Sequence, residues 1–186
     1  GEAAYEVKDV KTNSNLKHEI LKTSVQALKK LHSLNITSSK LRTLKDDLDF
    51  IKICIDNKLL NLEAFLANNN GKDPSSIYDY LMQNRHKHVN TAFVHGDFCL
   101  PNILIDKQNY GFIDMGDCGP GDPYKDYSSM EVSIKRNFGF EWVKYFYEYL
   151  NLENGVDMDK IKYYQLIDQF DYHLDHNKYL EYIAAK

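Results

Sequence analysis

The chain has 186 residues and a formal net charge of −4, from 23 basic and 27 acidic residues. This length allows one sizeable hydrophobic core or one lobe of a larger enzyme. The mild charge gives no support for a nucleic-acid partner, and no apolar run approaches the roughly 20 residues of a membrane-spanning helix. Three scattered cysteines without an apparent secretory signal predict reduced thiols and a cytoplasmic location.

The first half of the chain has the apolar periodicity of helices. The expected segments are an irregular polar lead-in over 1–14, helices over 15–34 and 41–60, a turn-rich loop over 67–74 and a short helix from 74 to about 85. The last of these helices is predicted to begin at Asp73 followed by Pro74, because aspartate is a favoured N-cap and proline suits the first helical position.

The middle of the chain changes to short apolar segments typical of strands. Strands are expected over 91–95, 102–106 and 110–115, the last two as a hairpin, followed by an irregular loop over 116–121 and helices over 122–138, 140–150 and 157 to beyond 170. No internal repeat or clear second domain is evident. The fold class predicted is α+β and mostly helical, with a small central β-hairpin.

The residues that carry chemistry lie around this hairpin. A strand ends at His95-Gly96-Asp97, Asn102 begins the next strand, and Asp114 follows the partner strand. Because a hairpin brings its two outer ends together, Asn102 and Asp114 are expected to meet, with Asp97 close by.

Oxygen ligands from Asn102 and Asp114 suit a hard cation such as Mg²⁺. Asp97 is then available as a catalytic base that accepts a proton from an attacking hydroxyl, which is the division of roles that phosphoryl transfer requires. His95 is expected to be a buried, hydrogen-bonded anchor of the loop, since Asp97 already fills the role of base.

The string HGDFCLPNILID, followed by YGFIDMGD, resembles the catalytic motifs of the aminoglycoside phosphotransferase family, and most of all its 3'-phosphotransferases. Weaker similarity in QALKKLHSL, GDPYKD and YQLIDQF extends the resemblance over about residues 15–172. The resemblance implies the protein-kinase-like fold, the cofactors Mg²⁺ and ATP (or GTP), and transfer of the γ-phosphate to a hydroxyl of an aminoglycoside antibiotic, which confers resistance.

The resemblance also implies roles for individual residues. Asp97 would be the base, and Asn102 and Asp114 would bind the metal, with Asn102 counted in the nucleotide site. Ile113 would pack on the adenine. Asp126 would be a structural carboxylate that supports the catalytic loop.

The resemblance also implies contacts to the substrate. Asp168 would contact an amino group of the antibiotic. Relatives often carry an acidic residue in the loop after the HGD turn and an Arg-Asp pair on the next helix, where this chain has Leu100 and Val132-Ser133. Glu131 is the candidate replacement as a substrate contact, and a solvated helix residue is the alternative interpretation.

A small cationic acceptor is favoured on charge, because Asp117, Asp122, Asp168 and Asp171 could surround the site with negative charge. Kinases of choline, fructosamine, homoserine or macrolides carry related loops, so these acceptors stay open. A non-catalytic binding module is the alternative from another class.

No glycine-rich phosphate loop and no strand lysine precede Asn15. The chain is therefore expected to comprise a post-hinge lead-in at 1–14 and a helical catalytic lobe at 15–186, with the hairpin at 102–115. This is the C-terminal lobe of the kinase-like fold, and an N-terminal nucleotide lobe would be its partner.

Overall fold

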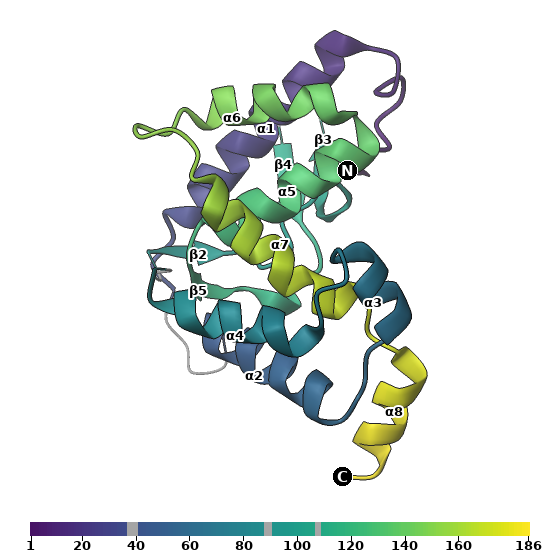
Figure 1. Ribbon diagram of the computed structural model, residues 1–186. Coiled ribbons are helices and arrows are strands. Elements are labelled where there is room, and N and C mark those ends of the chain that lie inside the picture. Colours follow the sequence, from purple (N-terminus) through teal and green to yellow (C-terminus); the bar gives the residue numbers. More distant parts are fainter. Residues whose placement is uncertain (37–40, 88–90, 107–108) are drawn as a thin grey trace. The chain divides into compact units, whose positions relative to one another are not determined.

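The computed structural model describes residues 1–36, 41–87, 91–106 and 109–186 (Figure 1). It divides the chain into two compact units, which the hydrophobic pattern did not suggest. Unit 1 comprises Gly1–Leu41 and Asn90–Ile161, and unit 2 comprises Arg42–Val89 and Lys162–Lys186. Within the described ranges, no helix combines the length and the apolar character needed to cross a membrane.

In its described residues, unit 1 contains three α-helices and the first residues of a fourth. These are α1 (Ser14–His32), α5 (Tyr124–Asn137), α6 (Val143–Leu150) and the start of α7 (Met158–Tyr172). Helix α1 begins after Asn13, whose side chain accepts a hydrogen bond from the Leu16 amide at 3.2 Å and so satisfies a free N–H of the first turn. Its buried stripe includes Leu21, Val25 and Leu28, and the helix contacts α6.

Two small antiparallel sheets complete unit 1. One has the strand order β1 (Glu2–Ala3), β3 (Ile103–Asp106) and β4 (Asn109–Phe112), and the other pairs β2 (Ala92–Val94) with β5 (Gly119–Gly121). In the first sheet Ile103 lies opposite Phe112, which fixes the open end of the hairpin at Asn102 and Ile113. In the second, Val94 lies opposite Gly119. The loop that begins at His95 follows directly after this last pair.

One hydrophobic core joins the helices and the hairpin of unit 1. Its fully or nearly fully buried members include Leu21, Leu28, Phe98, Leu100, Ile103, Met130, Ile134, Phe146 and Ile161. Because Phe98, Leu100 and Ile103 come from the segment between β2 and β4, this core fixes the backbone that carries the candidate site.

Unit 2 is helical. It contains α2 (Leu44–Asp56), α3 (Leu62–Asn68), α4 (Pro74–Asn84), the remainder of α7 and α8 (His176–Ala184). The ring centroids of Phe65 and Phe170 lie 5.0 Å apart. The Tyr163 hydroxyl donates to the Leu81 carbonyl at 3.2 Å, and these contacts join α7 to α3 and α4 within the unit.

The mostly helical α+β fold with a small hairpin is confirmed. The strand predicted over 110–115 ends at Phe112, because Asp114 takes a left-handed backbone conformation and a 3₁₀ turn follows. Two further local expectations were wrong, since the irregular lead-in contains β1 and the loop at 116–121 contains β5. Two additional short helices, α3 and α8, lie largely where no element was predicted. The elements β1, α3, β5 and α8 are two to nine residues long, too short for a period to stand out. The predicted turn at 107–109 lies partly outside the described residues.

The strand β5 escaped prediction because its sequence is Gly119-Pro120-Gly121, which lacks every side-chain signal of a strand. The pairing with β2 requires glycine at its end, since a Cβ atom at Gly121 would lie 2.7 Å from a methyl carbon of Val94. The close approach of the β5 backbone to β2, and not side-chain propensity, therefore determines this strand.

Candidate active site

The loop after β2 makes a sharp turn at Gly96. Its φ angle is +95°, and a Cβ atom there would lie 2.3 Å from the Asp117 carbonyl oxygen. Only glycine satisfies both the left-handed backbone and the close approach. The turn leaves His95 and Gly96 buried and brings Asp97 to the surface.

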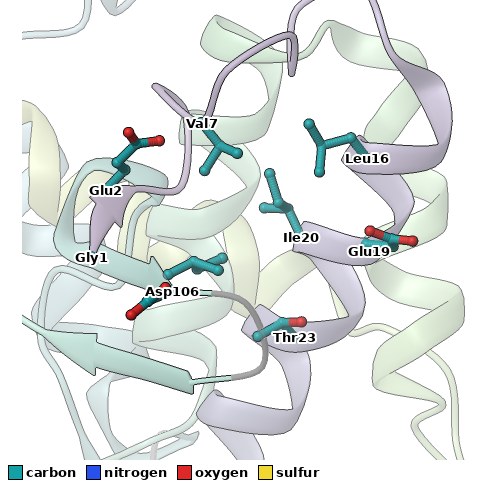
Figure 2. A pocket seen from close by; sticks show the side chains of 9 residues that line it. Gly1, Glu2, Val7, Leu16, Glu19, Ile20, Thr23 and Asp106 are labelled. Carbon is teal, nitrogen blue, oxygen red and sulfur yellow. The ribbon is translucent and has the colours of Figure 1, made fainter.

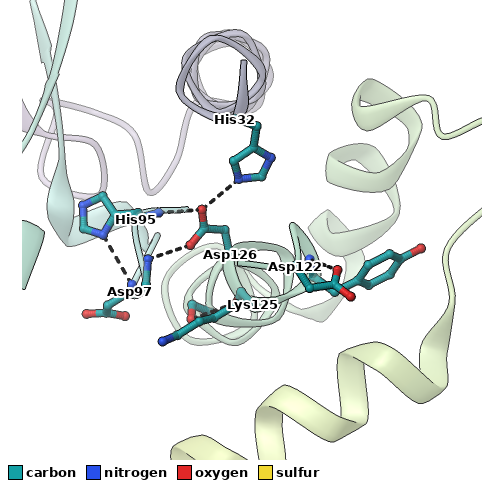
Figure 3. A network of polar contacts seen from close by, with 9 residues as sticks. His32, His95, Asp97, Asp122, Lys125 and Asp126 are labelled. Atoms are coloured by element: carbon teal, nitrogen blue, oxygen red, sulfur yellow. Dashed lines mark hydrogen bonds and ion pairs between the residues drawn. The ribbon is translucent and has the colours of Figure 1, made fainter. Parts of the chain in front are cut away.

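The side chain of Asp126 on α5 accepts hydrogen bonds from the backbone of this turn. One carboxylate oxygen accepts the His95 amide and the other accepts the Gly96 amide, each at 2.9 Å. The first of these oxygens also accepts Nε2 of His32 at 2.8 Å, as Figure 3 shows. Asp126 is 0% exposed, so these donors offset the loss of hydration of a buried charge.

His95 links the turn to the hairpin. Its Nε2 lies 3.0 Å from the Ile113 carbonyl, and its Nδ1 accepts the Asp97 amide at 3.3 Å. A carbonyl only accepts, so Nε2 carries the proton and Nδ1 is the acceptor. The buried ring therefore ties Asp97 to the residue just before Asp114.

Asn102 lies beside Asp97 and beside the end of the hairpin. Its side-chain Nδ2 donates to the Asp97 carboxylate at 2.9 Å and to the Asp97 carbonyl at 3.0 Å. Its own carbonyl accepts the Ile113 amide at 3.1 Å. Asp114 follows in the left-handed region, with φ 58° and ψ 51°, and its side chain is exposed.

The pKa of Asp97 is raised from its usual value. The largest cause is the surrounding protein, which displaces water from the carboxylate although the residue as a whole is exposed. The negative charge of Asp114 acts in the same direction, while His95 and the Asn102 amide oppose it.

The thiol of Cys99 lies 3.8 Å from the Asp97 carboxylate. Partial burial and the charge of Asp97 raise the pKa of Cys99 to about 12, so the thiolate is scarce at neutral pH. A nucleophilic role for Cys99 therefore has no support.

The oxygen donors near Asp97 determine which metal could bind. Among the residues that the structure describes, no group of three or more His, Cys, Asp or Glu could hold a metal ion. The set at the hairpin is smaller, with the amide of Asn102 and the carboxylate of Asp114. Two oxygen donors fit a cation such as Mg²⁺, which completes its shell with phosphate and water, and do not fit a zinc or transition-metal centre.

The two candidate substrate contacts, Glu131 and Asp168, belong to different units. Asp168 is half-buried on the part of α7 that belongs to unit 2. Glu131 on α5 is 2% exposed, and its carboxylate accepts the Tyr147 hydroxyl and pairs with Lys135. The alternative of a solvated Glu131 is therefore wrong, because helical periodicity turns this position toward the interior.

The expectation that Asp122 adds to the negative charge around the site is also wrong. Asp122 is 3% exposed and forms an ion pair with Lys160 at 2.6 Å. Its charge is compensated inside unit 1, so it does not add to the field around Asp97.

Two supporting residues were missed by the sequence analysis. The Ser133 hydroxyl accepts the buried Leu100 amide at 3.0 Å, which anchors the far end of the loop to α5. His32 reaches Asp126 from the end of α1. Neither has a sequence signal of its own, because each acts on a segment distant in the chain.

A separate surface pocket of about 580 Å³ lies between the start of the chain, α1 and β3 (Figure 2). Carboxylates of Glu2, Glu19 and Asp106 border it, and Ile20 and Ile105 form part of its apolar lining. None of the loop residues 95–102 lines this pocket.

Comparison with known proteins relates this chain to one family. A model of the phosphotransferase enzyme family matches residues 1–164. An aminoglycoside 3'-phosphotransferase of Niallia circulans is 30% identical over 152 residues, and one of Enterococcus faecalis is 29% identical over 159 residues. Each match covers 81% of this chain and 58% of the relative, so the chain spans somewhat more than half the length of these proteins.

Solved structures show the same fold. An aminoglycoside 3'-phosphotransferase of type VIII matches with a TM-score of 0.76 and 20% identity, over 91% of this chain and 65% of that one. An aminoglycoside phosphotransferase of Streptomyces rimosus, in complex with ADP and streptomycin, matches with a TM-score of 0.72 and 21% identity, over 91% and 67%. These matches and the family model confirm the resemblance seen in the motifs: the chain belongs to the phosphotransferase enzyme family.

Proposed function

We propose that the protein to which this chain belongs transfers the γ-phosphate of ATP or GTP to a hydroxyl group of an aminoglycoside. The observation that carries the proposal is the setting of Asp97. Asp97 is an exposed residue that directly follows the buried pair His95-Gly96, which Asp126 holds, and the Asn102 amide fixes the orientation of its carboxylate. A carboxylate that is accessible and rigidly placed suits a base for an incoming hydroxyl.

The proposed step balances with Asp97 as the proton acceptor. The acceptor hydroxyl oxygen forms a bond to the γ-phosphorus, and its proton passes to the Asp97 carboxylate. The bond between the γ-phosphorus and the β,γ-bridging oxygen breaks, and the nucleoside diphosphate leaves. The Asn102 amide keeps Asp97 facing the same direction before and after the transfer.

We propose Asn102 and Asp114 as the residues that hold magnesium. The Asn102 nitrogen already donates to Asp97, so its side-chain oxygen is the atom suited to a cation. When bound, the metal would neutralise charge on the nucleotide phosphates. Ile113, 45% exposed beside Asp114, offers an apolar surface for the nucleotide base.

The aminoglycoside class is supported by the curated relatives, which are named aminoglycoside 3'-phosphotransferases. Within this proposal Asp168 is the contact to a protonated amine, and phosphorylation of the antibiotic confers resistance. Glu131 is a weaker candidate, because its carboxylate is buried and held by Tyr147 and Lys135.

The test uses the full-length protein, because the relatives are longer than this chain. Release of nucleoside diphosphate is followed with MgATP or MgGTP against a panel of aminoglycosides, choline, homoserine, a fructosamine and a macrolide. We expect turnover with at least one aminoglycoside and none without magnesium. Turnover of another panel member alone would replace the substrate class, and no turnover with any acceptor would overturn the proposal.

A further inference from the structure

Helix α1 ends at His32, whose ring reaches the carboxylate that supports the catalytic turn. His32 Nε2 lies 2.8 Å from Asp126 Oδ2, the oxygen that also accepts the His95 amide. Helix α1 thus contacts the turn through one intermediate residue, although His32 and His95 lie 63 positions apart in sequence.

The direction of this hydrogen bond follows from its partner. An ionised carboxylate only accepts, so Nε2 of His32 carries the proton that is donated to Asp126. The side chain of Asp126 is 0% exposed and that of His32 is 10% exposed. Bulk water therefore has little access to replace the donor if the imidazole is removed.

The three donors constrain Asp126 in different ways. The amides of His95 and Gly96 donate to different oxygens of the Asp126 carboxylate, and both amides belong to the turn that must be held in place. His32 is the donor from outside the turn, and its ring packs against Tyr127 with centroids 5.7 Å apart. The imidazole thereby fixes the rotation of the carboxylate independently of the loop.

We propose that His32 is a positioning residue for Asp97, acting through Asp126 on the two amides that precede it. The inference rests on the proposed function in assigning a reaction to Asp97, and on geometry alone in assigning the hold on the turn. Without the Nε2 donor, the carboxylate rotates and the turn loosens. A base displaced by about 1 Å loses on the order of 100-fold in rate.

The same helix offers a matched control in His18. Its Nδ1 lies 2.6 Å from the Tyr149 hydroxyl, and its ring contacts Trp142 and Tyr145. His18 is thus a half-buried, hydrogen-bonded histidine of α1 with partners on α6 and the 3₁₀ turn η4 (Phe140–Trp142), which lie outside the catalytic turn. Its substitution perturbs the packing of α1 without removing a donor from Asp126.

Steady-state kinetics and amide exchange in the full-length protein test the proposal together. We expect His32→Phe to lower kcat about 10- to 100-fold with KM for nucleotide within twofold of wild type. His32→Gln, whose amide can reach the position of Nε2, retains most of kcat, and His18→Phe stays within about threefold of wild type. Exchange at the His95 and Gly96 amides becomes faster in His32→Phe only.

Unchanged exchange at these two amides in His32→Phe would overturn the proposal. Equal loss of kcat in His32→Phe and His32→Gln, or in His32→Phe and His18→Phe, would do the same, since the effect would then not depend on a donor at Nε2. If His32→Phe does not fold, His32→Asn replaces it in both measurements, because the asparagine amide is too short to reach Asp126.

The two proposals fail in distinguishable ways. A wild-type enzyme that phosphorylates no acceptor overturns the function. Amide exchange in the same proteins still decides whether His32 holds the turn, because this measurement needs no substrate.

Discussion

The chemical properties of Asp97 arise mainly from its neighbours. Its amide is bound by His95, its carboxylate by Asn102, and the two residues before it by Asp126. These three neighbours, His95, Asn102 and Asp126, are all buried. The turn is thus rigid before any ligand arrives, which lowers the entropic cost of aligning the base.

The role of Asp97 predicts the outcome of an isosteric substitution. Asp97→Asn keeps the size of the side chain and removes its ability to accept a proton. We expect kcat to fall by about 10²- to 10⁴-fold, the range typical of a lost general base, with nucleotide affinity unchanged. Rapid-quench turnover and isothermal titration with nucleotide measure the two quantities, and full turnover by this variant would contradict the assignment.

The role of Asp114 predicts a different pattern. Asp114→Ala removes a proposed metal ligand, so the affinity for Mg·nucleotide and kcat should fall together, and the magnesium concentration needed for half-maximal rate should rise. Asp106→Ala is the control, because Asp106 is an exposed aspartate of the same hairpin at the other end of β3. Equal magnesium dependence in the two variants would argue against the metal assignment.

At the level of elements, α5 supports the whole loop at residues 95–102, which carries the proposed base and is here called the catalytic loop. Asp126 holds the start of the loop and Ser133 holds its far end through the Leu100 amide. The buried stripe of α5 also includes Met130 and Ile134, which belong to the core of unit 1. The helix therefore couples the position of the loop to the packing of the unit.

This coupling predicts the effect of Ser133→Ala. The Leu100 amide would be left buried without its acceptor, at a cost of about 1–3 kcal/mol in the free energy of unfolding. We expect kcat to fall as well, because the loop end is released. Urea denaturation and turnover are the measurements.

Ser128 provides the control on the same helix. Its hydroxyl is buried and has no hydrogen-bond partner in the part of the chain that the structure describes. Ser128→Ala should therefore leave stability unchanged or raise it. A Ser128→Ala variant as unstable as Ser133→Ala would show that the helix tolerates no change at all, and would remove the special role of Ser133.

The long helices and the hairpin could be predicted because their signals are local. The two residues Asp73-Pro74 are enough to predict the start of α4, and in the structure the Asp73 side chain accepts the Ser76 amide as an N-cap. By contrast, β5 forms through backbone pairing with β2, and its glycines and proline give no strand signal. Contacts such as His32 with Asp126 join residues 94 positions apart, and no periodicity reports them.

At the scale of the whole molecule, each unit has buried aromatic residues of its own. In unit 1 the core includes Phe146 of α6, which is 0% exposed, and this core also contains residues of the catalytic loop. In unit 2 Phe65 and Phe170 pack together. The residues proposed to perform the chemical step all belong to unit 1, whereas Asp168, the proposed substrate contact, belongs to unit 2.

The core of unit 1 predicts a large loss of stability for Phe146→Ala. Removal of a fully buried ring costs about 3–5 kcal/mol in the free energy of unfolding. Phe140 is the matched control, because it is 75% exposed, and Phe140→Ala should cost less than about 1 kcal/mol. Urea unfolding followed by tryptophan fluorescence of Trp142 measures both, and similar midpoints would contradict the assignment of this core.

The two anchors of α5 are Asp126 and Ser133, seven positions apart. Seven residues make about two helical turns, so both side chains lie on one face. A single codon inserted between them would rotate Ser133 by about 100° around the axis and away from Leu100. Substitutions on the outer face of this stretch leave the anchors aligned, whereas a change of its length does not. Among descendants of this gene, the number of residues between the two anchors should therefore vary less than the identities of the residues that lie between them.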